Sequence, residues 1–231
     1  MKRIAIIPAR GGSRRLHKKN IKLFGGKPIM QWTIEAAKKA DLFDEILVSS
    51  EDDEVLEIAY QCEARPVVRD SEVAAYNKTV VDVCLNTMLH SEKQFERADQ
   101  MCCLYATSPL RTANDIRATV NLLQPTYCDF SMAVTHFDLP PNQALISLDN
   151  KRLTPRWPNL INNINANQTE YLVDNGSTYA VSIEAFKKTR SFYGPTLRGH
   201  IMPKNRSIDI NDQADFDRAL SLAKDLFQGM K

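Results

Sequence analysis

Short apolar runs alternate with amphipathic stretches over most of the chain. The runs at 3–7, 45–49 and 101–104 are typical of strands that are buried on both faces. Strands are predicted at 3–7, 45–49, 64–68, 101–104, 130–135 and 171–181, and helices at 29–40, 55–59, 79–90, after Thr112, and at 213–227. Because strands and helices alternate at the spacing of right-handed parallel units, we expect an α/β fold with a mainly parallel central sheet.

A basic loop with two adjacent glycines follows the first strand at 8–20. It holds Gly11, Gly12 and five Lys or Arg side chains between Arg10 and Lys19. Adjacent glycines let backbone N–H groups approach a ligand, and Lys and Arg supply charges suited to phosphate. The loop has neither a Walker sequence nor a G-x-G-x-x-G pattern, so a merely solvated charged loop is the competing interpretation. The order of strand, basic loop and helix, with Pro28 at the helix start, favours a polyphosphate site.

Acidic and hydroxyl residues mark two further helix starts. Asp52 and Asp53 precede a helical stretch, and we interpret them as cap and dipole residues rather than catalysts. Thr112 is predicted to cap the next helix, with Asp115 at its third position. In an open parallel sheet, ligands bind beyond the carboxyl ends of the strands. The loops after 3–7, 64–68 and 101–104 should therefore converge on one cleft.

The composition limits the classes of function. A chain of 231 residues suits a single domain spanning 1–231, and 30 basic against 28 acidic side chains give a net charge of +2, which argues against a general nucleic-acid binder. There is neither an apolar run of about 18 residues nor a signal-peptide pattern, so we expect no membrane partner and a cytoplasmic location. Cys62, Cys84, Cys102, Cys103 and Cys128 form no metal motif and are predicted to be reduced thiols.

The segment 136–170 departs from the βαβ pattern. It contains four prolines and scattered apolar residues, which suggests an inserted arm, either disordered or ordered. We favour an ordered arm because its Leu, Ile and Trp side chains need burial. The strand that follows contains Asn175-Gly176, which is either a simple turn or part of a binding pocket.

A polar and apolar alternation at 207–212 precedes the C-terminal helix. It places Asp209 and Asn211 on one face, with Ile208 and Ile210 on the other. Two oxygen ligands on one face suit Mg²⁺. The alternative is a polar strand edge followed by a helix cap from Asp212.

Several motifs together resemble one family. The motifs are 7–13 (IPARGGS), 19–21 (KNI), 26–28 (GKP), 107–111 (TSPLR), 175–176 (NG) and 207–210 (SIDI). The combination resembles the acylneuraminate cytidylyltransferases, or CMP-sialic acid synthetases, a family that includes pseudaminate and legionaminate relatives. The resemblance implies a three-layer, Rossmann-like nucleotidyltransferase fold with an inserted dimerisation arm at 136–170 that reaches the active site of the partner in a homodimer.

The resemblance also implies a reaction and a site. The reaction is Mg²⁺-dependent transfer of a cytidylyl group from CTP to a nine-carbon 2-keto sugar acid, with release of pyrophosphate. The expected nucleotide-binding residues are Ala9, Arg10, Gly11, Gly12, Ser13, Lys19, Asn20, Arg69 and Thr79, of which Arg10 and Lys19, together with Asp209, are the expected catalytic residues. The expected substrate-binding residues are Tyr105, Thr107, Ser108, Gln143, Asp174, Asn175 and Gly176, and the expected metal ligands are Asp209 and Asn211.

Two positions depart from the family pattern. Asn211 stands where the family commonly has a second Asp, so Asp212 is an alternative metal ligand. Tyr105-Ala106 stands where sialate-specific members have Gln-Pro, which resembles pseudaminate-type members, as does the stretch 137–145. Sialic, legionaminic and pseudaminic acids all stay open as acceptors. Two alternative functions are a nucleotidyltransferase for a sugar phosphate or eight-carbon keto acid, and a CTP-binding protein without turnover.

Overall fold

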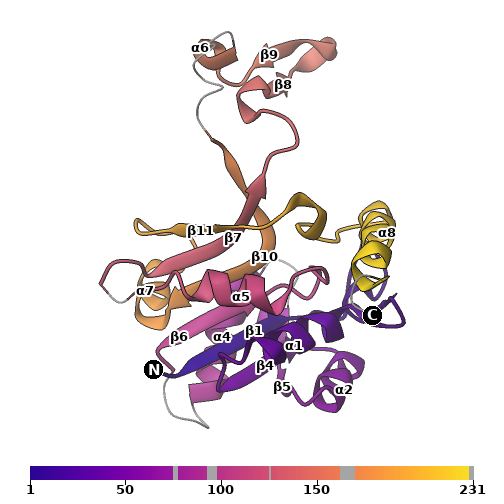
Figure 1. Cartoon of the computed structure of the whole chain (residues 1–231), viewed down its shortest axis with the longest axis vertical. Helices are drawn as coiled ribbons and strands as arrows, with labels where there is room; N and C mark the ends of the chain where they lie inside the picture. The colour runs from indigo at the N-terminus through magenta and orange to yellow at the C-terminus, as the bar shows by residue number, and fades with distance from the viewer. Residues whose placement is uncertain (75–77, 93–97, 125, 162–169, 229–231) are drawn as a thin grey trace.

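A seven-stranded sheet in the order β11-β7-β10-β6-β1-β4-β5 forms the centre of the molecule (Figure 1). The computed structural model describes residues 1–74, 78–92, 98–124, 126–161 and 170–228. The strands of this sheet are β1 (Arg3–Pro8), β4 (Glu45–Ser50), β5 (Arg65–Val68), β6 (Gln100–Leu104), β7 (Phe130–His136), β10 (Leu172–Ser182) and β11 (Arg198–Ile201). Only β10 runs antiparallel to its neighbours, β6 and β7. The predicted mainly parallel sheet is therefore confirmed.

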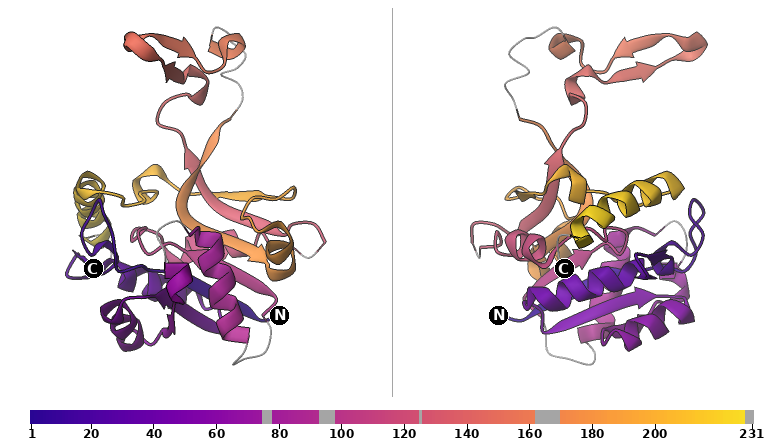
Figure 2. Two further views of the ribbon diagram at one scale, coloured as in Figure 1. Left: turned by 180° about the vertical axis from the view of Figure 1, so that it is seen from behind. Right: turned by 45° about the vertical axis from the view of Figure 1, so that its right-hand side comes forward.

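Helices cover both faces of this sheet, which makes three layers (Figures 1 and 2). One face is covered by α1 (Ile29–Ala40), α2 (Asp53–Gln61) and α5 (Ala113–Val120), and the other by α4 (Val80–Glu92) and α7 (Ile183–Thr189). In β1, Ala5 and Ile7 join the first apolar layer, whereas Ile4 and Ile6 join the second. This two-sided burial explains why the strand has an unbroken apolar sequence. None of the helices in the described part of the chain has the length and apolarity that a membrane crossing requires.

A third apolar cluster holds the C-terminal helix α8 (Gln213–Gln228) beside the loop that follows β1. Phe216 of α8 packs edge-on against Phe24, with ring centroids 5.7 Å apart. Phe24 lies in the short hairpin of β2 (Leu23–Phe24) and β3 (Lys27–Pro28). Ile208 and Ile210 are buried in the same cluster, as their alternation predicts. The packing therefore fixes Asp209, between them, close to the basic loop.

The predicted helix caps are confirmed. The Asp52 carboxylate accepts hydrogen bonds from the backbone N–H groups of Glu54 (2.9 Å) and Val55 (3.3 Å) at the start of α2. Thr112 and Asp115 form a reciprocal capping box at the start of α5. Side-chain oxygens thus satisfy N–H groups that lack a partner within the helix. All five cysteines are free thiols, as predicted.

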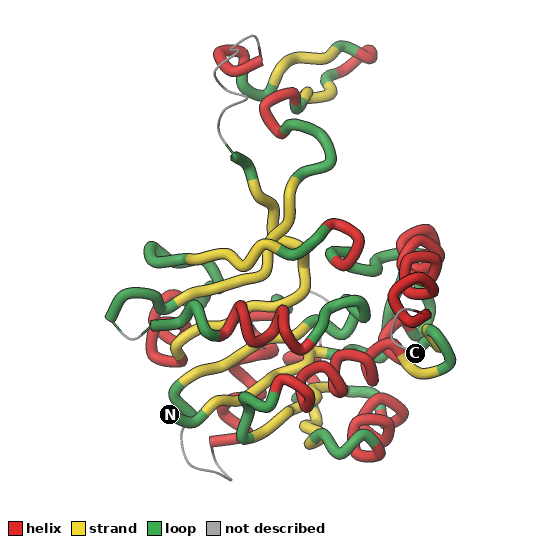
Figure 3. The backbone as a smooth tube through the Cα atoms, in the orientation of Figure 1, coloured by secondary structure: helices red, strands yellow, loops and turns green. Residues whose placement is uncertain are grey.

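Between β7 and β10 the chain leaves the sheet as an arm, which projects away from the body (Figures 1 and 3). The arm contains β8 (Leu145–Ser147) paired with β9 (Leu153–Pro155), the short helix α6 (Pro158–Ile161), and 3-10 turns at Pro141–Gln143 and Asp149–Lys151. The arm therefore contains regular secondary structure between 141 and 161, and 162–169 lie outside the described residues. The apolar side chains of the arm are not buried within this chain, since Leu145 is 51% and Trp157 42% exposed. The described residues also form the short elements η1 (Lys19–Ile21), α3 (Ser71–Ala74) and η5 (Lys204–Arg206).

Candidate active site

Loops at the carboxyl edge of the parallel strands enclose a basic cavity of about 300 Å³. Its positive charge comes from Arg10, Arg15, Lys19, Arg69 and Lys78. These residues follow β1 and β5, and Tyr105 to Thr107 contribute from the loop after β6. The three loops that the sequence predicted to converge therefore do so.

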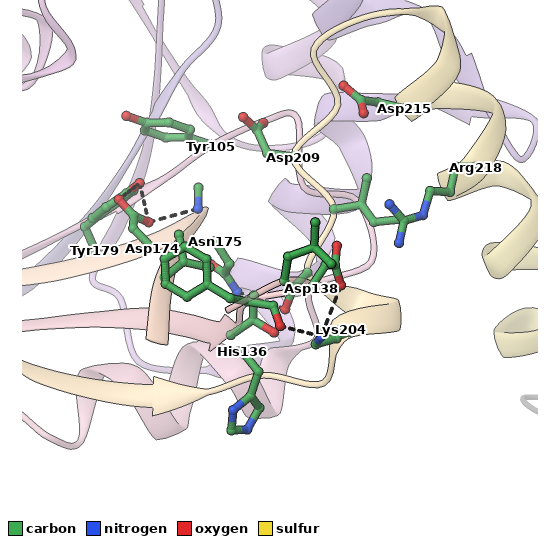
Figure 4. Close-up of a pocket in the computed structure, with 17 residues that line it drawn as sticks. Tyr105, His136, Asp138, Asp174, Asn175, Tyr179, Lys204, Asp209, Asp215 and Arg218 are labelled. Carbon is green, nitrogen blue, oxygen red and sulfur yellow. Dashed lines mark hydrogen bonds and ion pairs between the residues drawn. The ribbon is translucent and has the colours of Figure 1, made fainter. Parts of the chain in front are cut away.

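A second cavity, here called the outer cavity, adjoins the basic one and has a volume of about 690 Å³ (Figure 4). It is lined by carboxylates, by the cations Lys204 and Arg218, and by apolar side chains from the base of the arm. Tyr105 and Asp209 line both cavities. A ligand in one cavity therefore meets a ligand in the other beside these two side chains.

Lys19 lies at the end of the basic cavity nearest Asp209. Its Nζ donates a hydrogen bond of 2.7 Å to the backbone oxygen of Ile210. Burial lowers the pKa of Lys19, and the neighbouring charge of Asp209 opposes that effect. Asn20 is buried, and its amide donates to the backbone oxygen of Arg10 at 2.8 Å. Asn20 thus holds the shape of the loop, while Lys19 keeps two N–H groups for an anion.

The backbone amides of the basic loop differ in their availability. The N–H of Ala9 donates to Ser49 within the sheet edge at 3.0 Å, and the N–H of Gly11 donates to Glu51 Oε1 at 2.9 Å. Among the described residues, no atom lies within 4 Å of a Cβ added at Gly12. Ser13 follows Gly12 and is half-buried. The amides of Ala9 and Gly11 are therefore already engaged, whereas the space beside Gly12 is open.

Arg69 is buried at the floor of the basic cavity. Its Nε donates to Ser49 Oγ (3.3 Å), its Nη2 to the Ser49 backbone oxygen (2.7 Å) and its Nη1 to Glu51 Oε2 (3.2 Å). Burial lowers the pKa of Arg69, and the charge of Glu51 opposes the shift. Because a guanidinium has five N–H donors, one N–H on each terminal nitrogen is left for a ligand. Glu51 thereby connects Arg69 to the Gly11 amide.

Asp209 is held from both sides. Its Oδ1 accepts a hydrogen bond of 2.5 Å from Thr107 Oγ1, and its Oδ2 accepts one of 3.0 Å from the Asn211 amide. Burial raises the pKa of Asp209, with Thr107 and Lys19 acting in the opposite direction. A nearby cation stabilises the ionised form of a buried carboxyl group such as this one. Its partners leave lone pairs on both oxygens for such a ligand.

The two candidate metal ligands differ in their orientation. Asn211 turns its nitrogen toward Asp209, while its oxygen accepts a hydrogen bond of 2.8 Å from Arg15 Nη2. Asp212 accepts a hydrogen bond of 3.0 Å from the N–H of Asp215, so it caps α8, as the alternative interpretation expected. The described residues contain no group of three or more His, Cys, Asp or Glu side chains that could hold a metal ion. Asp209 therefore has the carboxylate oxygens that a Mg²⁺ ion would need, whereas Asn211 does not turn its oxygen toward that position.

Aromatic residues hold Asp174 on the far wall of the outer cavity (Figure 4). Tyr179 donates to both carboxylate oxygens at 2.9 Å, and Tyr193 donates to Oδ2 at 2.8 Å. Burial raises the pKa of Tyr179 and raises that of Tyr193 to about 12, so both hydroxyls stay protonated as donors. Tyr105 packs against Tyr179 with ring centroids 5.2 Å apart. Two tyrosine hydroxyls thus hold the Asp174 carboxylate, and Tyr105 packs beside Tyr179 in the lining of the cavity.

The Asn175-Gly176 pair lies in an irregularity of β10 rather than in a turn. The pairing of β10 with β7 shifts register between Asp174 and Tyr179, and Gly176 has a φ of 65°. A Cβ at Gly176 would lie 3.1 Å from the Cβ of Asp209. Ser108 donates to the Gly176 backbone oxygen at 3.0 Å, and Asn175 donates to Ser207 Oγ at 3.2 Å. These residues therefore fix the wall around Asp209.

Seven residues of the predicted site line neither cavity: Ala9, Gly11, Gly12, Ser13, Thr79, Ser108 and Gln143. Two of them have other roles or places in the fold. Thr79 exchanges hydrogen bonds with Asp82 at the start of α4, so it caps that helix. Gln143 lies in the arm and is exposed. Conversely, the cavities are also lined by four cations that were not predicted as site residues: Arg15, Lys78, Lys204 and Arg218. The charge of the loop at 8–20 marked Arg15, whereas the other three belong to no motif.

Comparison with known proteins places this geometry in a family. A family model described as "Cytidylyltransferase" matches residues 4–153. A pseudaminic acid cytidylyltransferase from Campylobacter jejuni is 31% identical over 97% of both chains. A CMP-N,N'-diacetyllegionaminic acid synthase from Legionella pneumophila is 29% identical over 94% of both chains. The solved structure of a CMP:2-keto-3-deoxy-manno-octonic acid synthetase complexed with CTP has the same fold, with a TM-score of 0.70 at 17% identity over 98% of this chain and 100% of that one. The resemblance seen in the sequence is thus confirmed, and the chain belongs to the cytidylyltransferase family.

Proposed function

We propose that the protein transfers a cytidylyl group from CTP to a nonulosonic acid, giving the CMP-sugar and pyrophosphate. The observation that carries this proposal is the junction of a basic cavity and an outer cavity at Tyr105 and Asp209. The basic cavity suits a nucleoside triphosphate, and the outer cavity is large enough for a nine-carbon sugar acid. A sugar hydroxyl at the junction lies next to the α-phosphorus of the nucleotide.

The residues of the basic cavity take the nucleotide roles in this proposal. Arg10, Lys19 and the backbone of the loop at Gly12 and Ser13 bind the triphosphate, and Arg69 offers its two remaining N–H groups to the nucleotide. Attack of the sugar hydroxyl on the α-phosphorus forms a P–O bond, breaks the bond to pyrophosphate and releases the hydroxyl proton to solvent. Charge then grows on the phosphoryl oxygens and the leaving group, and fixed cations such as Lys19 stabilise it.

We further propose that Asp209 holds the Mg²⁺ ion of this reaction. The buried position and raised pKa of its carboxyl group support a cation beside it. When bound, the ion neutralises phosphate charge during transfer. Asn211 supports the carboxylate through its amide nitrogen and would have to turn to offer its oxygen.

A homodimer in which the arm contacts a second copy is part of the proposal. The arm exposes Leu139, Leu145, Leu153 and Trp157, of which Leu139 is 78% exposed. Such an apolar surface favours association with another protein surface. Gln143 belongs to the same arm, so its predicted contact with substrate requires the site of the partner. A CTP-dependent enzyme of this kind also suits the cytoplasmic location expected from the sequence.

Among the acceptors, pseudaminic acid is favoured by the 31% identity with the Campylobacter enzyme and by Tyr105. The test is incubation with CTP, Mg²⁺ and a panel of pseudaminic, legionaminic and sialic acids, an eight-carbon keto acid and a sugar phosphate. The product is identified by mass and pyrophosphate is measured in parallel. Exclusive turnover of the eight-carbon acid or the sugar phosphate would contradict the proposal. Tight CTP binding with no product from any acceptor would favour a binding protein.

A further inference from the structure

The end of the outer cavity that lies away from the nucleotide presents a guanidinium with no assigned role. Arg218 lines this cavity but not the basic one, and Figure 4 shows its side chain pointing from α8 toward the cavity. Arg218 also lines a smaller neighbouring cavity, together with Lys204 and Asp138. The helix under it is fixed, because Phe216 and Ala219 are buried in the third apolar cluster. The position of Arg218 is therefore set by the fold.

Arg218 has no partner within the described residues, since it takes part in no hydrogen bond or ion pair there. The carboxylates that line the same cavity are already engaged. Asp138 pairs with Lys204 at 3.1 Å, and Asp215 accepts from the N–H groups of Asn211 (2.9 Å) and Asp212 (3.3 Å). Asp174 is held by its two tyrosines. The N–H groups of Arg218 are thus available to a ligand.

The place of Arg218 decides which part of an acceptor it can meet. In a 2-keto sugar acid the carboxylate and the reacting hydroxyl share one carbon, so both belong at the junction beside Asp209. The opposite end of the molecule is its exocyclic side chain. Phe137, Leu139 and Ile208 line the outer cavity as well, which sets apolar groups around a charged donor. An acylamino group matches that combination, because its carbonyl accepts hydrogen bonds and its methyl group is apolar.

We propose that Arg218 is a specificity-determining residue that donates hydrogen bonds to an acyl carbonyl on the side chain of the sugar acid. The proposal rests on the proposed function and narrows the acceptor to acids acylated at that position. Arg218 binds substrate away from the reacting atoms, so it acts on acceptor affinity rather than on CTP.

The test compares wild type with Arg218→Gln on two nine-carbon acids. One acid carries an acylamino group on its side chain, as in diacetylated nonulosonic acids, and the other carries hydroxyl groups there. For the acylated acid we expect kcat/KM to fall by about 10- to 100-fold, the usual effect of losing a hydrogen bond from a charged group. For the hydroxylated acid we expect a change of less than about threefold, measured as inhibition constant if the acid is not turned over.

Two variants control the experiment. Lys224→Gln removes a cation from the same helix outside both cavities and should leave all constants unchanged. Arg218→Lys keeps the charge without the planar fork and should fall between wild type and Arg218→Gln. The KM for CTP and the unfolding temperature should stay constant in Arg218→Gln. Equal losses for the two acids, or no loss for the acylated one, would overturn the proposal while product formation by wild type leaves the proposed function intact.

Discussion

Gly176→Ala tests whether the irregularity in β10 exists to make room for Asp209. The substitution has two effects that can be separated. The backbone of Gly176 has a φ of 65°, which an alanine adopts with strain, and its new Cβ would lie 3.1 Å from the Cβ of Asp209. The first effect lowers stability, and the second moves the side chain of Asp209.

The size of each effect follows from this geometry. The left-handed backbone costs a residue with a Cβ about 1–2 kcal/mol. Loss of backbone freedom in the unfolded chain returns about 0.4–1 kcal/mol, so the net loss is about 1 kcal/mol. In a chain of this size that corresponds to a fall of about 2–4 °C in the unfolding temperature. Relief of the tight contact shifts Asp209 by a few tenths of an ångström, and since about 1 Å costs roughly 100-fold in rate, we expect a three- to tenfold loss of kcat.

Gly26→Ala is the matched control. Gly26 has a φ of 91°, and among the described residues no atom lies within 4 Å of a Cβ added there. It therefore carries the backbone strain without the contact to Asp209. Thermal unfolding and steady-state kinetics are measured on both variants in parallel. Both should lose stability, and only Gly176→Ala should lose activity. Equal kcat values for the two variants would refute the reasoning.

Three more substitutions test the basic cavity and its junction. Lys19→Ala should lower kcat by about 100- to 1000-fold, the cost of one fixed donor to a developing anion, with an unchanged circular dichroism spectrum; a fully active variant would remove Lys19 from the triphosphate site. Glu51→Gln sets an amide N–H against Arg69 and should raise the KM for CTP about tenfold; a lower KM would mean that Glu51 competes with phosphate. Because burial raises the pKa of Asp209, kcat/KM should fall on the acid side at a higher pH than for an exposed carboxyl group. The residual activity of Asp209→Asn should not show this fall of kcat/KM at acid pH.

The central strands could be predicted because each is buried on both faces and therefore consists of a continuous run of apolar residues. Edge strand β11 could not, since Arg198, Gly199 and His200 carry no apolar pattern and the strand depends on its pairing with β7. In the arm, the composition indicated an excursion but contained no signal for the β8 and β9 hairpin. The local sequence thus determines the strands of the core, whereas the edge strand and the hairpin of the arm depend on tertiary contacts.

The same division applies to the site. Lys19 and Arg69 follow strands β1 and β5, so the sheet topology brought them together, and the burial of Ile208 and Ile210 placed Asp209 beside them. Thr79 was expected at the nucleotide, yet a side chain one residue before a helix finds its partner in the helix itself. Arg218 could not be predicted, because its approach to the outer cavity depends on how α8 packs on residues far away in the sequence.

The junction of the two cavities at Tyr105 and Asp209 has a consequence for inhibition. A molecule that occupies both cavities makes its second set of contacts intramolecularly, at an effective concentration that can reach the millimolar range for a short linker. The CMP-sugar is such a molecule, so it retains contacts in both cavities after pyrophosphate has left. A stable compound that joins a cytidine phosphonate to an acylated sugar acid should therefore bind much more tightly than either half alone.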